Sequence, residues 1–338
     1  MYFTKIVLSL VLYFNFCYSQ TPVKPLVTGY DQDVAKRFMR LSAGAYSINP
    51  TPCINRAFNN NGNYVIFNNQ TTICDKGNNT CTYYSIISNQ TKEIIIIFRG
   101  TKTNDQLFRE GISTLVDGEN FFNIGLVNKY FYRAHLILWK SIDEIFKENN
   151  YKDYKVYVTG HSLGGALAAL CAVRIRLENY RNSNDIILYT FGEPRVGSAK
   201  FAFKFDELIP NSWRVVHNLD IVPHLPGCAK DSGSSLLQLI FSKTSYPCDP
   251  LQLDEPYHHG TEIWYPEGMG ENDTFIECTG TPKNEDFDCS DQYRLDLSNF
   301  NLYVYYHRHY FNHAVPAFGK LGCLPGMEET EEILTNAS

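Results

Sequence analysis

Apolar residues along the chain follow two alternating patterns, continuous runs and helical stripes, which together predict the secondary structure. Residues 94–98 read Ile-Ile-Ile-Ile-Phe, an uninterrupted run typical of a strand that is buried on both faces of a sheet. Further strands are predicted at 155–159, 186–191 and 213–217, and helices at 31–47, 127–148 and from residue 163 onward. Strands that alternate with helices indicate an α/β domain with a mostly parallel sheet covered on both faces.

Other parts of the chain lack this pattern. The Asn- and Thr-rich stretch 49–82 is predicted to be a surface excursion. Neither an internal repeat nor a Pro- or Ser-rich linker divides the chain, so a single domain is predicted from 20 to 327. The acidic stretch 328–338 is predicted to be a mobile tail without a function of its own.

The N-terminus has the order of a signal peptide over residues 1–19. One early lysine, Lys5, precedes an apolar run from Ile6 to Phe16, and a small residue, Ser19, stands at the expected cleavage point. The run is too short to cross the roughly 30 Å of hydrocarbon in a bilayer, and no later segment has the roughly 20 apolar residues of a transmembrane helix. A secreted protein without a transmembrane segment is therefore predicted.

Composition narrows the choice of partners and disulfides. The 338 residues carry 30 Lys and Arg against 36 Asp and Glu, a net charge of −6, which argues against binding of nucleic acid through bulk positive charge.

Of ten cysteines, Cys17 belongs to the signal peptide, and an odd number remains. In an oxidising compartment one thiol is then unpaired, and Cys171, in a strongly apolar helical stretch, is predicted to be that buried residue.

Eight cysteines are left for four disulfides. Proximity along the chain predicts the pairs Cys74–Cys81, Cys228–Cys248 and Cys278–Cys289, and leaves Cys53 to join Cys323. A zinc site is the alternative use of these residues, but no Cys-x2-Cys pair occurs, so no metal site is predicted. Candidate glycosylation sequons begin at Asn69, Asn78, Asn89, Asn272 and Asn336.

The strongest chemical signal is Gly160-His161-Ser162-Leu163-Gly164, between a predicted strand and a predicted helix. In a nucleophile elbow, small residues at the first and last positions allow a sharp turn that presents the serine, here Ser162, above the sheet. The pentapeptide also arises by chance in loops, but the flanking strand and helix favour the elbow. A serine needs a base oriented by an acid, and Asp220, just past a strand, is the favoured acid over Asp206 and Asp185. Its alternative role is that of a turn former.

Five segments extend this signal, and through them the chain resembles the fungal-type class 3 lipases, particularly secreted nematode members. The segments are 96–101 (Ile-Ile-Phe-Arg-Gly-Thr), 158–166 around the elbow, 190–197 (Thr-Phe-Gly-Glu-Pro-Arg-Val-Gly), 220–226 (Asp-Ile-Val-Pro-His-Leu-Pro) and 259–264 (His-Gly-Thr-Glu-Ile-Trp). They run in family order over about 260 residues. The resemblance implies an α/β-hydrolase fold, no cofactor, Ser162 as nucleophile and Asp220 as acid.

The family motif Asp-His-x-x-Tyr-Phe corresponds here to Tyr306-His307-Arg308-His309-Tyr310-Phe311. Aligning the final Tyr-Phe identifies His307 as the catalytic base, with Tyr306 in place of the usual acid. His309 and His313 remain alternatives, and a His-x-His metal site is disfavoured because no acidic or cysteine partner is near in the sequence. Other histidines, His224, His258 and His259, are predicted to be structural.

The resemblance also assigns the oxyanion hole and a lid. The backbone N–H of Leu163 is the donor that follows the nucleophile, and Thr101 occupies the family position of the second donor, with a turn or helix cap as the alternative. The segment 102–114 corresponds to a mobile amphipathic lid, with Leu107, Phe108 and Ile112 as its apolar residues. An ordinary surface loop is the alternative. Because Leu107 replaces a tryptophan common in relatives and the apolar stripe is thin, strong interfacial activation is not expected.

These features predict a secreted serine hydrolase that cleaves carboxylic esters of lipids, most simply triacylglycerols, at a lipid–water interface. A phospholipase A1 or a feruloyl-type esterase would use the same elbow. A non-catalytic lipid-binding protein is the alternative from another class, and it predicts the loss of a catalytic serine, acid or base.

Overall fold

The computed structural model describes residues 28–61, 63–101, 118–230, 245–293 and 296–326. The predicted signal peptide and the acidic tail lie outside these residues. No helix within the described ranges combines the length and apolar character needed to cross a bilayer.

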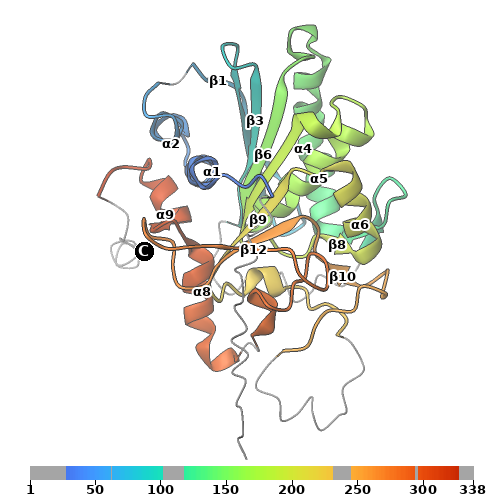
Figure 1. Ribbon diagram of the computed structural model, residues 1–338. Coiled ribbons are helices and arrows are strands. Elements are labelled where there is room, and N and C mark those ends of the chain that lie inside the picture. Colours follow the sequence, from blue (N-terminus) through green and yellow to red (C-terminus); the bar gives the residue numbers. More distant parts are fainter. Residues whose placement is uncertain (1–27, 62, 102–117, 231–244, 294–295, 327–338) are drawn as a thin grey trace, which may run out of the picture.

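An eight-stranded sheet forms the centre of the molecule (Figure 1). In spatial order its strands are β1 (Val65–Ile73), β2 (Thr80–Ser88), β3 (Glu93–Phe98), β6 (Lys155–His161), β7 (Ile186–Phe191), β9 (Ser212–His217), β11 (Thr261–Tyr265) and β12 (Ile276–Cys278). The five strands from β3 to β11 pair in parallel, whereas β1, β2 and β12 add antiparallel edges. The predicted mostly parallel α/β sheet is thus confirmed.

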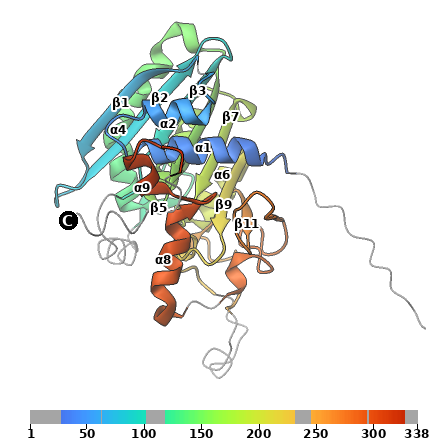
Figure 2. The same ribbon diagram turned by 90° about the vertical axis from the view of Figure 1, so that its left-hand side faces the viewer.

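Helices cover both faces of this sheet (Figure 1). One face carries α4 (Lys129–Lys147), α5 (Leu163–Leu177) and α6 (Ala199–Leu208), and the other carries α1 (Gln32–Gly44), α2 (Thr51–Ala57) and α9 (Val315–Lys320). The helix α8 (Phe300–Arg308) lies below α1 and α9, beyond the end of the sheet (Figure 2).

Shorter elements complete the described part of the chain. Two small antiparallel sheets contain β4 (Gly118–Asn120), β5 (Leu126–Asn128), β8 (Gly197–Ser198) and β10 (Pro256–Tyr257), and β13 (His309–Tyr310) with β14 (His313–Ala314). Single 3-10 turns are η1 (Asn149–Tyr151), η2 (Ser183–Asp185), η3 (Val222–His224), η4 (Ser290–Gln292) and η5 (Leu297–Asn299).

The apolar run of β3 is explained by two separate cores, one on each face of the sheet. Ile94, Ile96 and Phe98 belong to the core beneath α4 and α5, whereas Ile95 and Ile97 belong to the core beneath α1 and α9. Successive side chains of a strand point to opposite faces, so a strand covered on both sides must be apolar at every position.

The prediction of a surface excursion over 49–82 was wrong. The segment contains α2, the edge strand β1 and the first residues of β2. Side chains of β1 alternate between exposed and half-buried, as expected at a solvated edge where polar residues are tolerated. The predicted helix at 127–148 begins two residues later, because residues 126–128 form β5.

Four disulfides link the cysteines in the predicted pairs. They join Cys53 to Cys323, Cys74 to Cys81, Cys228 to Cys248 and Cys278 to Cys289. Cys171 is a free thiol and is fully buried in α5. The first of these bonds joins α2 to the residues that follow α9 and closes a separation of 270 residues.

Candidate active site

Ser162 lies in the sharp turn between β6 and α5. Its backbone has φ 60° and ψ −131°, a positive φ that non-glycine residues rarely adopt and that marks functional strain. Its N–H donates to the carbonyl of Phe191 at 2.8 Å, which ties the turn to the end of the neighbouring strand β7. The residue is nearly buried and precedes the first turn of α5, where the helix dipole favours negative charge.

Sterics explain why glycines flank this serine. A Cβ on Gly160 would overlap the backbone carbonyl of Gly164, and a Cβ on Gly164 would overlap the carbonyl oxygen of Phe98. The helix α5 therefore crosses β3 and β6 with backbone against backbone. This close approach is the geometry of the nucleophile elbow.

Asp220 and His307 form a buried pair beside this turn. Nδ1 of His307 lies 3.0 Å from both carboxylate oxygens of Asp220. Because a carboxylate only accepts, Nδ1 carries the proton in the neutral imidazole and Nε2 holds the lone pair. Asp220 follows β9, and His307 is in the last turn of α8, so residues 87 positions apart in the sequence meet here.

Two further donors hold the carboxylate of Asp220. The hydroxyl of Tyr310 donates to Oδ2 at 2.6 Å, and the N–H of Val222 donates to Oδ1 at 2.9 Å. Burial alone would raise the pKa of Asp220, but His307 and these hydrogen bonds outweigh it, and the pKa lies below its usual value. The acid is therefore ionised at neutral pH.

The alternative bases lie elsewhere. His309 directs Nδ1 to the carbonyl of Tyr305 at 2.8 Å and stacks on that ring, and His313 packs against Phe318. The alternative acid Asp206 accepts from the backbone of Gly260. Of the three candidate histidines, His307 is the one for which a contact with Asp220 is observed in the described residues.

His161 was not assigned a role from the sequence, yet it contacts the base directly. Its Nε2 donates to the carbonyl of His307 at 2.8 Å, its Nδ1 accepts from the hydroxyl of Tyr46 at 2.8 Å, and its ring stacks on the His307 ring with centroids 4.8 Å apart. Burial, together with the neighbouring His307, lowers the pKa of His161 to about 3, so the residue stays neutral. No motif in the sequence links Tyr46 at the end of α1 to this site.

Leu163, one predicted oxyanion donor, directly follows Ser162 in the chain, and the residue before the other, Thr101, lies close to the serine. Leu163 is the first residue of α5, and Gly100, one residue before Thr101, is so close that a Cβ built on it would lie 3.1 Å from Cβ of Ser162. The predicted lid residues Leu107, Phe108 and Ile112 lie outside the described residues.

Acidic and sulfur ligands cluster at two places in the described ranges, Cys228 with Cys248 and Asp291, and Cys278 with Cys289 and Glu262. In each cluster both sulfurs belong to one disulfide and are not thiolate ligands. The sequon residues Asn69, Asn78, Asn89 and Asn272 are exposed, and Asn336 is outside the described residues.

Comparison with known proteins decides the family. Residues 95–230 match the family model for lipase (class 3). The chain is 46% identical over 298 residues to a lipase of Caenorhabditis elegans, covering 88% of this chain and 84% of that protein. This protein belongs to the class 3 lipase family. The predicted resemblance is confirmed, and the class 3 lipase is a carboxylic ester hydrolase.

Two further similar proteins are a solved lipase structure and a plant enzyme. A triacylglycerol lipase whose catalytic centre is described as a serine protease triad superposes with a TM-score of 0.57 at 27% identity, covering 83% of this chain and 94% of that chain. A chloroplastic phospholipase A1 of Arabidopsis thaliana is 39% identical over 93 residues, 26% of this chain and 18% of that protein. The α/β-hydrolase fold is thereby confirmed.

Proposed function

We propose that this class 3 lipase is a secreted triacylglycerol lipase that acts through Ser162, His307 and Asp220 at a lipid–water interface. The observation that carries the proposal is the buried Asp220–His307 pair, held beside a strained serine between β6 and α5. A triacylglycerol lipase with a serine triad among the structural relatives supports the substrate class.

The reaction starts with proton transfer from the hydroxyl of Ser162 to Nε2 of His307, as the serine oxygen attacks the ester carbonyl. Asp220 is ionised and stabilises the imidazolium that forms. The protonated His307 then donates to the leaving alcohol, and an acyl-enzyme remains on Ser162. Water, deprotonated by His307, hydrolyses this ester and releases the fatty acid.

The tetrahedral intermediates carry negative charge on the former carbonyl oxygen. The N–H of Leu163 and a donor from Thr101 stabilise this oxyanion, aided by the N-terminus of α5. Replacement of Thr101 by Val removes its hydroxyl while keeping its shape, and Thr101→Ser keeps the hydroxyl. We expect kcat to fall about 100-fold for Thr101→Val and to change little for Thr101→Ser, whereas equal kcat for both variants would remove the hydroxyl from the oxyanion hole.

Secretion is supported by the leader-like N-terminus and by four disulfides, which persist in oxidising compartments. Expression of the full chain in a eukaryotic secretory host tests this part. We expect the protein in the medium, cleaved near residue 19 and glycosylated at exposed sequons, as seen by mass spectrometry before and after enzymatic deglycosylation. Retention of an uncleaved chain in the cell would contradict it.

The catalytic part is tested with wild type and Ser162→Ala on emulsified triolein, phosphatidylcholine and methyl ferulate. We expect the highest turnover on triolein, and loss of all turnover and of fluorophosphonate labelling in Ser162→Ala. Preference for phosphatidylcholine would favour a phospholipase A1, which the Arabidopsis relative makes the second candidate. A wild type without labelling would indicate a non-catalytic lipid-binding protein.

A further inference from the structure

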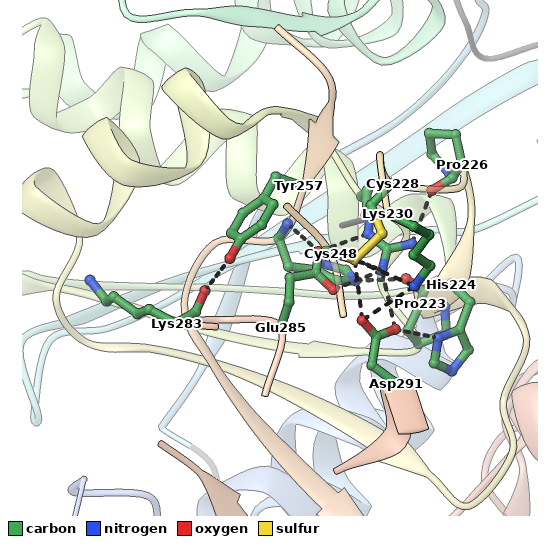
Figure 3. Close-up of a disulfide and its surroundings, with 12 residues drawn as sticks. Pro223, His224, Pro226, Cys228, Lys230, Cys248, Tyr257, Lys283, Glu285 and Asp291 are labelled. Carbon is green, nitrogen blue, oxygen red and sulfur yellow. Dashed lines mark hydrogen bonds and ion pairs between the residues drawn. A yellow bond between two sulfur atoms is a disulfide. The ribbon is translucent and has the colours of Figure 1, made fainter. Parts of the chain in front are cut away.

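A buried arginine, Arg195, pairs with two buried carboxylates outside the catalytic residues. Figure 3 labels these carboxylates, Glu285 and Asp291. Nε and Nη2 of Arg195 donate to the two carboxylate oxygens of Glu285, each at 2.7 Å, and Nη2 also lies 3.3 Å from Oδ1 of Asp291. All three side chains are almost fully buried. A forked, bidentate pair of this kind fixes the orientation of the guanidinium as well as its charge.

The same arginine holds the loop that carries the catalytic acid. The backbone N–H of Arg195 donates to the carbonyl of Leu225 at 2.9 Å, and its Nη1 donates to the carbonyl of Pro226 at 3.0 Å. These two residues end the segment 220–226, which begins with Asp220. The guanidinium thus connects the loop after β7 to the loop after β9.

Two other contacts hold the middle of the acid loop. Nδ1 of His224 lies 3.0 Å from Oδ1 of Asp291, the carboxylate that also faces Arg195, and Nε2 of His258 donates to the carbonyl of Pro223 at 2.6 Å. Each residue from 223 to 226 is therefore held by an atom from outside the loop. His224 and His258, predicted to be structural, both take part.

The constraint is transmitted to the acid through a short 3-10 turn, η3. The N–H of Leu225 donates to the carbonyl of Val222 at 3.0 Å, and the N–H of Val222 donates to Oδ1 of Asp220 at 2.9 Å. A shift of Leu225 and Pro226 would move Val222 and so change the orientation of the carboxylate toward His307. The residues that Arg195 holds, Leu225 and Pro226, are therefore connected to Asp220 by hydrogen bonds within one short segment.

The charge of Arg195 stabilises a buried carboxylate, and its forked geometry favours arginine over lysine at this place. Burial would raise the pKa of Asp291, but Arg195, His224 and Lys230 outweigh it and hold that pKa well below its usual value. Lysine would retain the charge but lose the fork, because its single ammonium nitrogen replaces the three guanidinium nitrogens that contact Glu285 and the carbonyl of Pro226.

We propose that Arg195 is a positioning residue for ester hydrolysis: by clamping residues 223–226 it keeps Asp220 aligned with His307. The proposal rests on the proposed function, since it assigns Asp220 and His307 their catalytic roles. A merely structural arginine would affect stability and leave the chemistry of the folded enzyme unchanged.

The test compares Arg195→Lys with Arg181→Lys, a matched replacement of a buried arginine remote from the acid loop. Arg181 donates to the backbone carbonyls of Tyr151, Tyr154 and Tyr180. For a soluble p-nitrophenyl ester, we expect Arg195→Lys to lower kcat about tenfold or more with little change in KM. The acidic limb of kcat/KM should move to lower pH, because a displaced Asp220 stabilises the His307 imidazolium less.

Arg181→Lys should lower the melting temperature while leaving kcat and the pH profile of the folded enzyme as in wild type. If Arg195→Lys gives little folded protein, Glu285→Gln replaces it, because this variant weakens the bidentate pair that orients the Arg195 guanidinium toward the carbonyl of Pro226. A wild-type kcat and pH profile in the folded variant would overturn the positioning role. Failure of the proposed function is distinct from this: the wild type itself would then show neither turnover nor labelling.

Discussion

The hydroxyl of Tyr310 donates a 2.6 Å hydrogen bond to Oδ2 of Asp220. The carboxylate that orients His307 is thus itself oriented by Tyr310, which comes three positions after His307 in the sequence. Tyr310 is fully buried, and burial together with Asp220 raises its pKa well above the usual value. The phenol therefore remains a donor throughout the working pH range.

Replacement of Tyr310 by Phe should lower kcat about tenfold with little change in KM, because a hydrogen bond to a buried charge contributes roughly 1.5–3 kcal/mol. The ring still packs against Phe191 and His161. Steady-state kinetics on a soluble ester measure the effect, with the melting temperature as the control for folding. An unchanged kcat would show that Val222 and His307 hold Asp220 sufficiently.

Gly192 lies against the Asp220–His307 pair and has a positive φ of 57°. A Cβ here would lie 2.5 Å from Oδ2 of Asp220 and 2.8 Å from Nδ1 of His307, closer than real contacts allow. Gly192→Ala should therefore separate the acid from the base and lower kcat by about 10³–10⁴, as does loss of the acid in other serine triads.

The matched control for Gly192→Ala is Gly227→Ala, because a Cβ at Gly227 meets no atom of the described residues within 4 Å. Gly227→Ala should retain wild-type kcat and the wild-type rate of fluorophosphonate labelling. Similar activity in Gly192→Ala and Gly227→Ala would show that the close packing of Gly192 against the Asp220–His307 pair is not needed for activity.

The four disulfides should contribute unequally to stability. Cys53 and Cys323 are 270 residues apart in the sequence, whereas Cys74 and Cys81 are 7 residues apart. Loop-closure entropy predicts that replacing the long-range pair with serines lowers the free energy of unfolding by about 5.6 kcal/mol, against about 2.3 kcal/mol for the short pair. Denaturation in urea measures both, and an equal or larger loss for the short pair would contradict this ranking.

Buried neutral histidines should make the fold labile in acid. Burial, with a smaller contribution from Arg174, lowers the pKa of His135 to about 3, and His161 has a similar value. The unfolded chain binds protons at these groups from about pH 6.5 downward, whereas the folded chain does not, so stability falls as the pH falls from 6.5 toward 3.

His135→Asn should remove one such group and reduce that pH dependence by about 1.4 kcal/mol per pH unit within this window. His135 is in α4, outside the proposed catalytic groups, so activity at pH 7 should be retained by the folded variant. Urea unfolding at a series of pH values measures the slope, and an unchanged slope would show that His135 is protonated in the fold.

Local pattern was sufficient for part of the site. The run at 94–98 predicts a buried strand because alternate side chains enter two cores, and the small residues around Ser162 predict a turn that admits backbone against backbone. The resemblance to class 3 lipases then identified Asp220 and His307 by order and register, and the structure brings these two into contact. Their catalytic roles remain proposals.

Long-range contacts were beyond the reach of such patterns. Nothing around Tyr46 indicates that its hydroxyl meets His161, and nothing in the loop after β7 indicates that Arg195 holds the carbonyls of Leu225 and Pro226. The sequence specifies periodicity, turn chemistry and the cysteines available to pair, because these depend on neighbours along the chain. Tertiary packing alone decides which buried polar atoms meet, because each must find a partner among groups brought together only when the sheet and its helices close.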